Sequence, residues 1–235
     1  MPKTRSGLAN QRSPGNYKIF NDSAYGGFEY EGDGREAEDF FQQYSNFDEL
    51  IREMNYDDIR AFQRWASGEF MNGQQWGDFD NMTSREQEFT RVYDKYLDRS
   101  RLDEGVQVVR YGSAELLLGR GKSLASSLSE LQAMEGSVIH AKGSMSFGAA
   151  KTGLEIGGRK NVEYKLSIPK GTTGAGMWIG DERINGWGSM QREFLTNRDV
   201  DYKVGKTTYD SKRDVYVVEL RYDGRTKHDY GRRGI

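Results

Sequence analysis

The sequence predicts an α+β fold, in which an N-terminal helical lobe packs on a core of two mainly antiparallel β-sheets. Two observations support this prediction. Amphipathic helical patterns are confined to residues 35–102, and β-branched runs separated by glycine-rich turns follow from residue 103 onwards. Because long helices do not alternate regularly with these strands, a parallel, doubly wound sheet is not expected.

The chain has 235 residues, enough for one domain with a full core. An irregular N-terminal arm rich in Gly, Ser, Asn and Asp is expected over residues 1–34. The domain itself is expected to span residues 35–222, with the helical lobe at 35–102 and the β core at 103–222. A basic C-terminal tail, residues 223–235, completes the chain.

The helical lobe is expected to contain helices at residues 36–44, 47–54, 56–70 and 84–102. The last has the strongest pattern, because Thr83 or Ser84 can cap its start and Glu86 suits its positive end. Its apolar stripe, expected to be core, consists of Phe89, Val92, Tyr93, Tyr96 and Leu97.

The β core is expected to contain strands at residues 106–111, 137–140, 162–168, 191–195, 202–204 and 215–222. A further strand is expected to begin near Ser144 and Ser146, just after the turn at Gly143. Glycine-rich turns separate the strands, as in an antiparallel arrangement.

Composition limits the chemistry that the chain can perform. The formal charge is −2, so no global basic field attracts nucleic acid or membrane. The absence of cysteine excludes thiol nucleophiles and zinc-thiolate sites, and with two histidines no metal site is expected. Neither a membrane-spanning run nor a signal peptide is evident, so we expect no membrane insertion and a cytoplasmic location in the producing or target cell.

One short motif combines an amide and a carboxylate. Gln191 and Glu193 lie two residues apart on an expected strand, so alternation would turn both side chains to one face. The glycine-flanked Trp187 precedes them in a loop, and the apolar Phe194 and Leu195 follow. An ordinary solvated strand face is the alternative interpretation of this motif.

Three upstream features add charged and hydroxyl groups. Arg110 lies near the end of an apolar strand, where it needs either a carboxylate or a phosphate partner. Ser144 or Ser146 can hydrogen-bond a catalytic carboxylate, although capping of local backbone is the commoner use. The double-glycine loop that ends in Arg159 is either a phosphate clamp or a tight turn with a solvated cation.

Taken in chain order, these features resemble the mono-ADP-ribosyltransferases of the R-S-E type, the group that includes the clostridial binary toxins and the Rho-modifying exoenzymes. The resemblance extends roughly over residues 55–222 and, through Gln191 and Glu193, to the Gln-x-Glu subtype. It implies the ADP-ribosyltransferase-like fold and NAD⁺ as a substrate, without a metal ion.

The resemblance also implies a role for each residue in NAD⁺ cleavage. Glu193 would hold the ribose and stabilise the positive charge that develops on it, and Ser146 would keep Glu193 in position. Arg110 and Arg159 would grip the diphosphate. The residues expected to bind NAD⁺ are Arg110, Arg159, Ser146, Tyr111 and Gly112.

Gln191 and Trp187 are expected to recognise the acceptor of ADP-ribose. By resemblance, the acceptor is an Asn or Gln side chain of a host protein, or guanine in nucleic acid. Two alternatives remain: a plain NAD⁺ glycohydrolase, and a phage structural or interaction protein with an inactive transferase domain. The protein is expected to be a monomer, and either exported by a specialised system as a toxin or effector or delivered by a bacteriophage.

Overall fold

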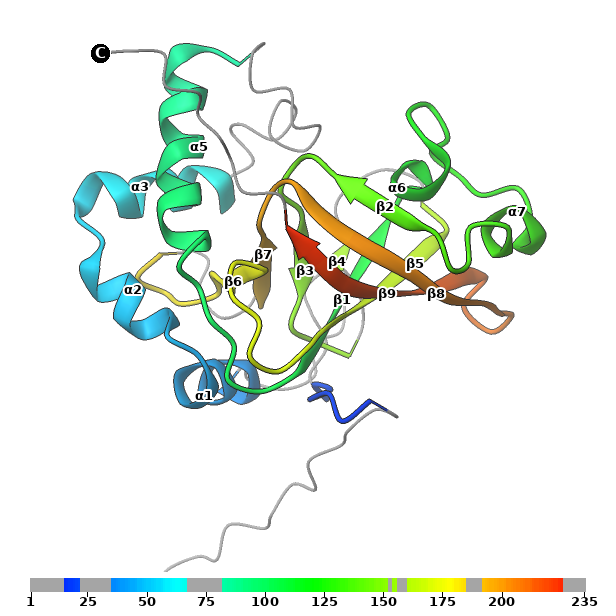
Figure 1. Cartoon of the computed structure of the whole chain (residues 1–235), viewed down its shortest axis with the longest axis horizontal. Helices are drawn as coiled ribbons and strands as arrows, with labels where there is room; N and C mark the ends of the chain where they lie inside the picture. The colour runs from blue at the N-terminus through cyan, green and yellow to red at the C-terminus, as the bar shows by residue number, and fades with distance from the viewer. Residues whose placement is uncertain are drawn as a thin grey trace, which may run out of the picture.

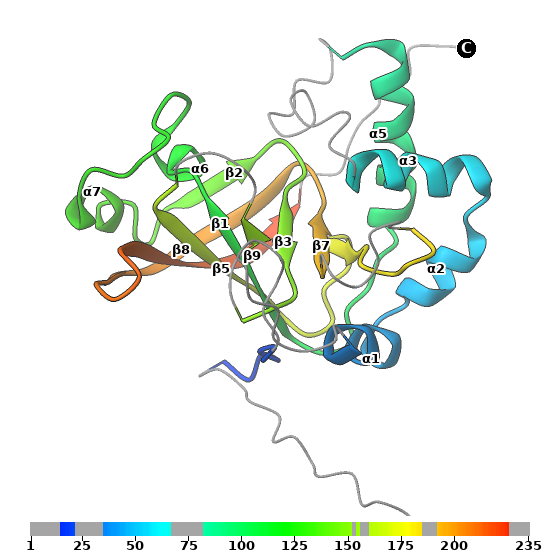
Figure 2. The ribbon, with the colours of Figure 1, turned by 180° about the vertical axis from the view of Figure 1, so that it is seen from behind.

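The structure, a computed structural model, describes residues 15–21, 35–66, 82–151, 154–155, 160–184 and 192–225. Four helices of the lobe are α1 (Arg35–Tyr44), α2 (Phe47–Glu53), α3 (Tyr56–Ala66) and α5 (Ser84–Leu97). They gather at one end of the sheet, beside strands β6 and β7, in both views (Figures 1 and 2). The prediction of an N-terminal helical lobe is therefore confirmed.

Helix α5 begins as its sequence predicts and ends five residues early. Thr83 and Glu86 form a capping box, in which each side chain accepts a hydrogen bond from the other residue's backbone N–H. The helix was expected to reach residue 102 but ends at Leu97. The Ser100 hydroxyl donates to the carbonyl of Leu97, and the Leu102 N–H donates to Thr172, so the chain leaves the helix to join a distant loop.

The strands are β1 (Val106–Gly112), β2 (Val138–Ala141), β3 (Ser146–Gly148), β4 (Leu154–Glu155), β5 (Val162–Ile168), β6 (Gly176–Trp178), β7 (Glu193–Thr196), β8 (Val200–Asp210) and β9 (Val215–Arg225). Their order is β2-β8-β9-β5-β1-β3-β7-β6, and β4 pairs with β1. Neighbours are antiparallel except β5–β9 and β1–β4. Two short helices, α6 (Glu115–Leu118) and α7 (Leu128–Gln132), were not predicted.

The expected mainly antiparallel pairing is confirmed, but the strands form one continuous order and not two separate sheets. The junction is narrow: β1 and β3 share a single register pair, Val109 with Gly148. Beside it, strand β4 pairs in parallel with β1, with Arg110 in register with Leu154 and Tyr111 with Glu155. Two blocks of strands therefore meet at β1, close to Arg110.

Aromatic side chains join the lobe to the sheet. Phe41 of α1 stacks on Trp178 and Phe194, with ring centroids 5.7 and 5.8 Å apart. Phe20, from the predicted irregular arm, is also buried, and Lys18 bridges to Val106 of β1. Part of the arm thus packs on the domain. Within the described ranges, no helix has the length and apolar character needed to cross a bilayer.

Candidate active site

Three neighbouring strands bring together residues that are far apart in the chain. In the sheet order, β1 carries Arg110, β3 carries Ser146 and β7 carries Glu193. Ser146 and Glu193 are buried, and Arg110 is partly exposed. The sheet therefore converts the predicted chain order of an arginine, a serine and a glutamate into one cluster.

The register of β3 and β7 explains how Ser146 meets Glu193. Gly148 lies directly opposite Glu193, and Ser146 lies opposite Leu195. Ser146 and Glu193 are therefore diagonal neighbours on one face, and Gly148 presents no side chain between them. The Ser146 hydroxyl donates a hydrogen bond to Oε1 of Glu193. Ser144 is buried as well but makes no hydrogen bond to Glu193, so the geometry selects Ser146.

A third side chain, which the sequence did not single out, reaches the same carboxylate. The indole Nε1–H of Trp65, in α3, lies 3.0 Å from Glu193 Oε1 and 3.2 Å from Ser146 Oγ. Both donors to Glu193 thus meet one oxygen, and Oε2 accepts no hydrogen bond from the described residues. The helical pattern of residues 56–66 places Trp65 three residues after the buried Phe62, so it indicates a core residue. It does not indicate a hydrogen bond to Glu193, which lies 128 residues further along the chain.

Burial sets the protonation behaviour of Glu193. Loss of hydration raises the pKa of its carboxyl group above the ordinary value, because the charged form is poorly solvated. The hydrogen bonds from Ser146 and Trp65, together with the charge of Arg110, oppose this rise. The cluster therefore contains a carboxylate that protonates at a higher pH than an exposed glutamate does.

Arg110 is held by the cluster without a carboxylate in contact. Its Nη1 donates to the backbone carbonyl of Ser146 at 2.6 Å, the one hydrogen bond that the described residues provide. Burial lowers the pKa of its guanidinium, while the nearby Tyr164 and Glu193 raise it. A Cβ atom at Gly112 would lie 3.2 Å from the Tyr164 ring and 3.4 Å from Arg110 Nε, so glycine leaves room for both side chains.

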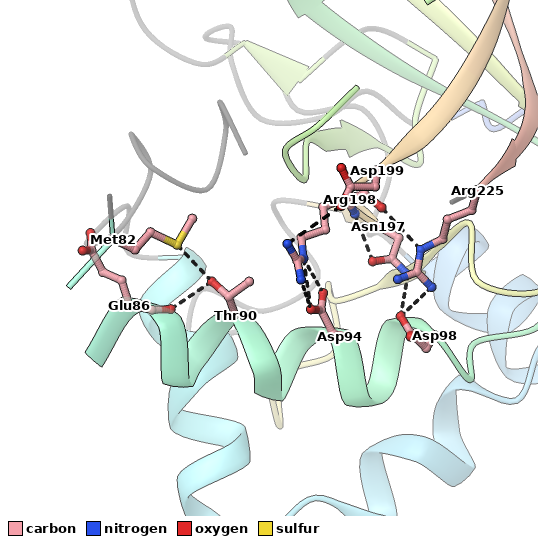
Figure 3. A network of polar contacts seen from close by, with 9 residues as sticks. All are labelled: Met82, Glu86, Thr90, Asp94, Asp98, Asn197, Arg198, Asp199 and Arg225. Carbon is pink, nitrogen blue, oxygen red and sulfur yellow. Dashed lines mark hydrogen bonds and ion pairs between the residues drawn. The ribbon is translucent and has the colours of Figure 1, made fainter. Parts of the chain in front are cut away.

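Strand β7 is anchored on both sides of the sheet and at its end. Phe194 and Leu195 are fully buried. Directly after the strand, Arg198 grips Asp94 of α5, with Nη2 2.7 Å from Oδ2 and Nε 3.0 Å from each oxygen (Figure 3). Asn197 donates to Asp98, the residue that caps the end of the same helix. Helix α5 thereby fixes the strand that carries Glu193.

Asp98 extends this contact to the last strand. Arg225 Nη1 lies 2.5 Å from Asp98 Oδ1, and Arg225 Nε donates to the carbonyl of Arg198 at 3.3 Å (Figure 3). The segment between β7 and β8 and the end of β9 therefore share one polar network with α5 and its cap.

The start of β7 differs from the predicted strand. The strand begins at Glu193, and Arg192 has a φ of 46°, in the left-handed region that non-glycine residues rarely adopt. The alternation argument that placed Gln191 and Glu193 on one face therefore does not apply. Gln191, Trp187 and Arg159 lie outside the described residues.

Tyr111 and Gly112, the remaining residues expected to bind NAD⁺, contact protein groups. The Tyr111 hydroxyl donates to the carbonyl of Lys160 at 2.9 Å. This bond connects β1 to the segment just after Arg159. Among the described residues, no three side chains of the His, Cys, Asp or Glu type are grouped so as to hold a metal ion.

Comparisons with known proteins identify the fold and the family of this chain. The structure is similar to C3stau2 from S. aureus, solved with NAD (TM-score 0.66, 18% identity, 89% of this chain and 99% of that chain). It is also similar to the toxin Plx2a from Paenibacillus larvae (0.66, 15%, 81% and 96%) and to the Clostridium limosum C3 exoenzyme (0.63, 13%, 85% and 98%). Curated protein sequences gave no match. A sequence model described as ADP-ribosyltransferase exoenzyme matches residues 74–223, more than half of the chain. The chain therefore belongs to the ADP-ribosyltransferase exoenzyme family.

Proposed function

We propose that this protein cleaves NAD⁺ and transfers ADP-ribose to a macromolecular acceptor at the cluster of Arg110, Ser146 and Glu193. The observation that carries the proposal is the convergence of these residues on three adjacent strands, with Glu193 held by Ser146 and Arg110 held without a carboxylate in contact. Family membership supports the same reaction.

Glu193 is the group that we assign to bond cleavage. Its Oε1 receives both protein donors, which leaves Oε2 to accept a hydrogen bond from a ribose hydroxyl. A buried carboxylate next to the sugar stabilises the positive charge that develops as the ribose–nicotinamide bond breaks. Because the electrons of that bond leave with nicotinamide as a neutral base, the site needs no general acid.

Arg110 fits the role of an anion holder. An arginine with a free edge and reduced hydration can bind a phosphate group through two parallel hydrogen bonds. Its bond to the Ser146 carbonyl uses Nη1, so the other nitrogens of the fork remain for a diphosphate. Arg159, at the end of the double-glycine loop, is proposed as a second cation for the same diphosphate.

The acceptor is proposed to present an amide. A glutamine at position 191 has one donor and one acceptor, which matches an Asn or Gln side chain in a protein or the amide-like edge of guanine. A guanidinium would instead favour a carboxylate at this position. Trp187 is proposed as the apolar contact surface for that acceptor.

Labelled NAD⁺ tests this function. The protein is incubated with NAD⁺ labelled in its adenosine part and with a cell lysate, and the fate of the label and of nicotinamide is followed. We expect nicotinamide to be released and the label to enter a macromolecule. Protease treatment should make the label soluble if the acceptor is a protein, and nuclease treatment should do so if it is a nucleic acid. Glu193→Gln should abolish both, whereas Glu219→Gln, an exposed carboxylate on β9 separated from β7 by three strands, should change neither.

Two outcomes would contradict the proposal. Release of nicotinamide without label in any macromolecule would identify a glycohydrolase. No consumption of NAD⁺ at all would remove the enzymatic assignment.

A further inference from the structure

The indole of Trp65 makes an unusual contact for a core tryptophan. It is 4% exposed, and its N–H lies between Glu193 Oε1 and Ser146 Oγ, at 3.0 and 3.2 Å. An indole N–H can donate but not accept, so its bonds to these two oxygens are of defined direction. Trp65 therefore contributes a donor to the candidate active site from the helical lobe, whereas the other members of the cluster come from the sheet.

The support behind Trp65 keeps this donor in place. The Trp65 ring packs edge-on against Tyr93 of α5, with ring centroids 5.8 Å apart and planes at 80°. The Tyr93 hydroxyl donates to the carbonyl of Ala61 at 2.7 Å, which ties α3 to α5. Helix α5 in turn holds the end of β7 through the pair of Asp94 and Arg198. Donor and acceptor are thus fixed by one connected set of contacts.

The direction of the two donors determines how the carboxylate is presented. The Ser146 hydroxyl and the Trp65 N–H both bind Oε1, so a rotation of the carboxylate that moved Oε1 away would break two hydrogen bonds. On the basis of the proposed function, we propose that Trp65 is a positioning residue for NAD⁺ cleavage, whose indole N–H locks Glu193 so that Oε2 is the oxygen that meets the ribose.

Replacing Trp65 has different expected effects if it serves only in packing and if it positions Glu193. Loss of packing would lower the stability of the fold. Loss of the N–H would also destabilise the charged form of Glu193, because the bond from Trp65 is one of the influences that oppose the effect of burial on the pKa. Ser146 and Arg110 are the other groups that face Glu193, and both remain in a Trp65 variant.

Trp65→Phe removes the N–H and keeps an aromatic ring. A matched control is Trp178→Phe: Trp178 is 2% exposed, and its indole N–H has no hydrogen-bond partner in the described structure. For NAD⁺ hydrolysis, Trp65→Phe should lower kcat about tenfold or more, with KM within about twofold of the wild type. The acidic limb of the pH–rate profile should move to higher pH. Trp178→Phe should leave both the profile and kcat near wild type.

A second replacement covers the case in which Trp65→Phe does not fold. Benzothienylalanine incorporated at position 65 keeps the shape of the bicyclic ring and lacks the N–H, so it should reproduce the loss of kcat and the shifted limb at wild-type thermal stability. An unchanged kcat and acidic limb in a folded position-65 variant, or an equal shift in Trp178→Phe, would overturn the role of Trp65 while leaving the proposed function intact. A wild-type protein that releases no nicotinamide would instead overturn the proposed function itself.

Discussion

Two arginines near the strand that carries Glu193 differ in how their charges are compensated: Arg198, which follows β7, and Arg110, which lies on β1, on the far side of β3. Arg198, just after β7, is paired with Asp94 through three close contacts of 2.7 to 3.0 Å. Arg110, on β1, has one backbone carbonyl and only the more distant charge of Glu193. Both guanidinium groups are at least partly withdrawn from water, but only that of Arg198 has a carboxylate of the protein in contact.

This difference separates a structural charge, that of Arg198, from the charge that we propose to bind the diphosphate of NAD⁺, that of Arg110. A buried ion pair with good geometry keeps its helix and strand in register, and nothing further needs to bind it. A partly desolvated guanidinium without a carboxylate in contact lacks a counter-charge that a bound anion would supply. Glu193 also has an unused acceptor, because Trp65 and Ser146 both donate to Oε1 and no described residue donates to Oε2. Arg110 and Glu193 lie in one cluster, where a single substrate could bind to both.

The largest expected effect breaks the structural pair. Asp94→Asn keeps the shape of the side chain but leaves the Arg198 guanidinium only the more distant carboxylate of Asp199, 3.8 Å from its Nη1. The loss of the closer partner should cost about 3 kcal/mol of the free energy of unfolding. Denaturant titration measures this loss. Asp103→Asn is the control, because its ion pair with Arg101 is about half exposed and should be worth less than about 1 kcal/mol. Equal losses in the two variants would show that the Arg198 pair contributes no more than a surface pair.

The second effect concerns turnover. Glu193→Gln keeps the size of the side chain and one acceptor oxygen but removes the negative charge and replaces the second acceptor oxygen by an NH₂ donor. Because the charge acts on the positive character that develops during bond cleavage, kcat for NAD⁺ hydrolysis should fall by about a hundredfold or more. The melting temperature and the NAD⁺ affinity should stay near wild type. Near-normal turnover in a folded variant would mean that Glu193 is not the group that stabilises the developing charge.

The third prediction compares the same substitution, arginine to lysine, at Arg110 and at Arg198. Arg110→Lys replaces a planar fork by a point charge, so NAD⁺ should bind about tenfold more weakly while stability changes little. Arg198→Lys should do the reverse, with a lower melting temperature and an unchanged affinity. Calorimetric titration and thermal melting of both variants measure the contrast. If Arg110→Lys retained full affinity and lost stability, Arg110 would be a structural residue like Arg198.

The sequence predicted the elements whose causes are local. The segment 162–168, in which apolar and polar residues alternate, forms strand β5 with the expected bounds. Thr83 caps α5 through a box that is readable in four residues. Contacts between distant segments were less accessible. The early end of α5 depends on a bond from Leu102 to Thr172. The contact between Trp65 and Glu193 depends on how the lobe sits on the sheet, which no local pattern specifies.

The candidate site shows the same division. Arg110, Ser146 and Glu193 were predicted from their order along the chain, and the sheet brings them together. The face assigned to Gln191 was argued from strand alternation, and the left-handed backbone of Arg192 breaks that pattern. Non-glycine residues adopt this conformation when surrounding contacts require it, so alternation alone could not have foreseen it.

The smallest expected change in NAD⁺ cleavage comes from the acceptor side of the site. Gln191→Glu should lose transfer to the native acceptor, because a carboxylate lacks the donor that an amide edge needs, yet retain much of the hydrolysis, because water requires no such partner. Trp187→Ala should give the same separation through lost contact area. Measuring label transfer and nicotinamide release on each variant tests whether acceptor recognition is separate from bond cleavage. If both activities fell together in both variants, the segment before Glu193 would belong with Arg110 and Glu193 to the groups that cleave NAD⁺, and the acceptor would have to be recognised elsewhere.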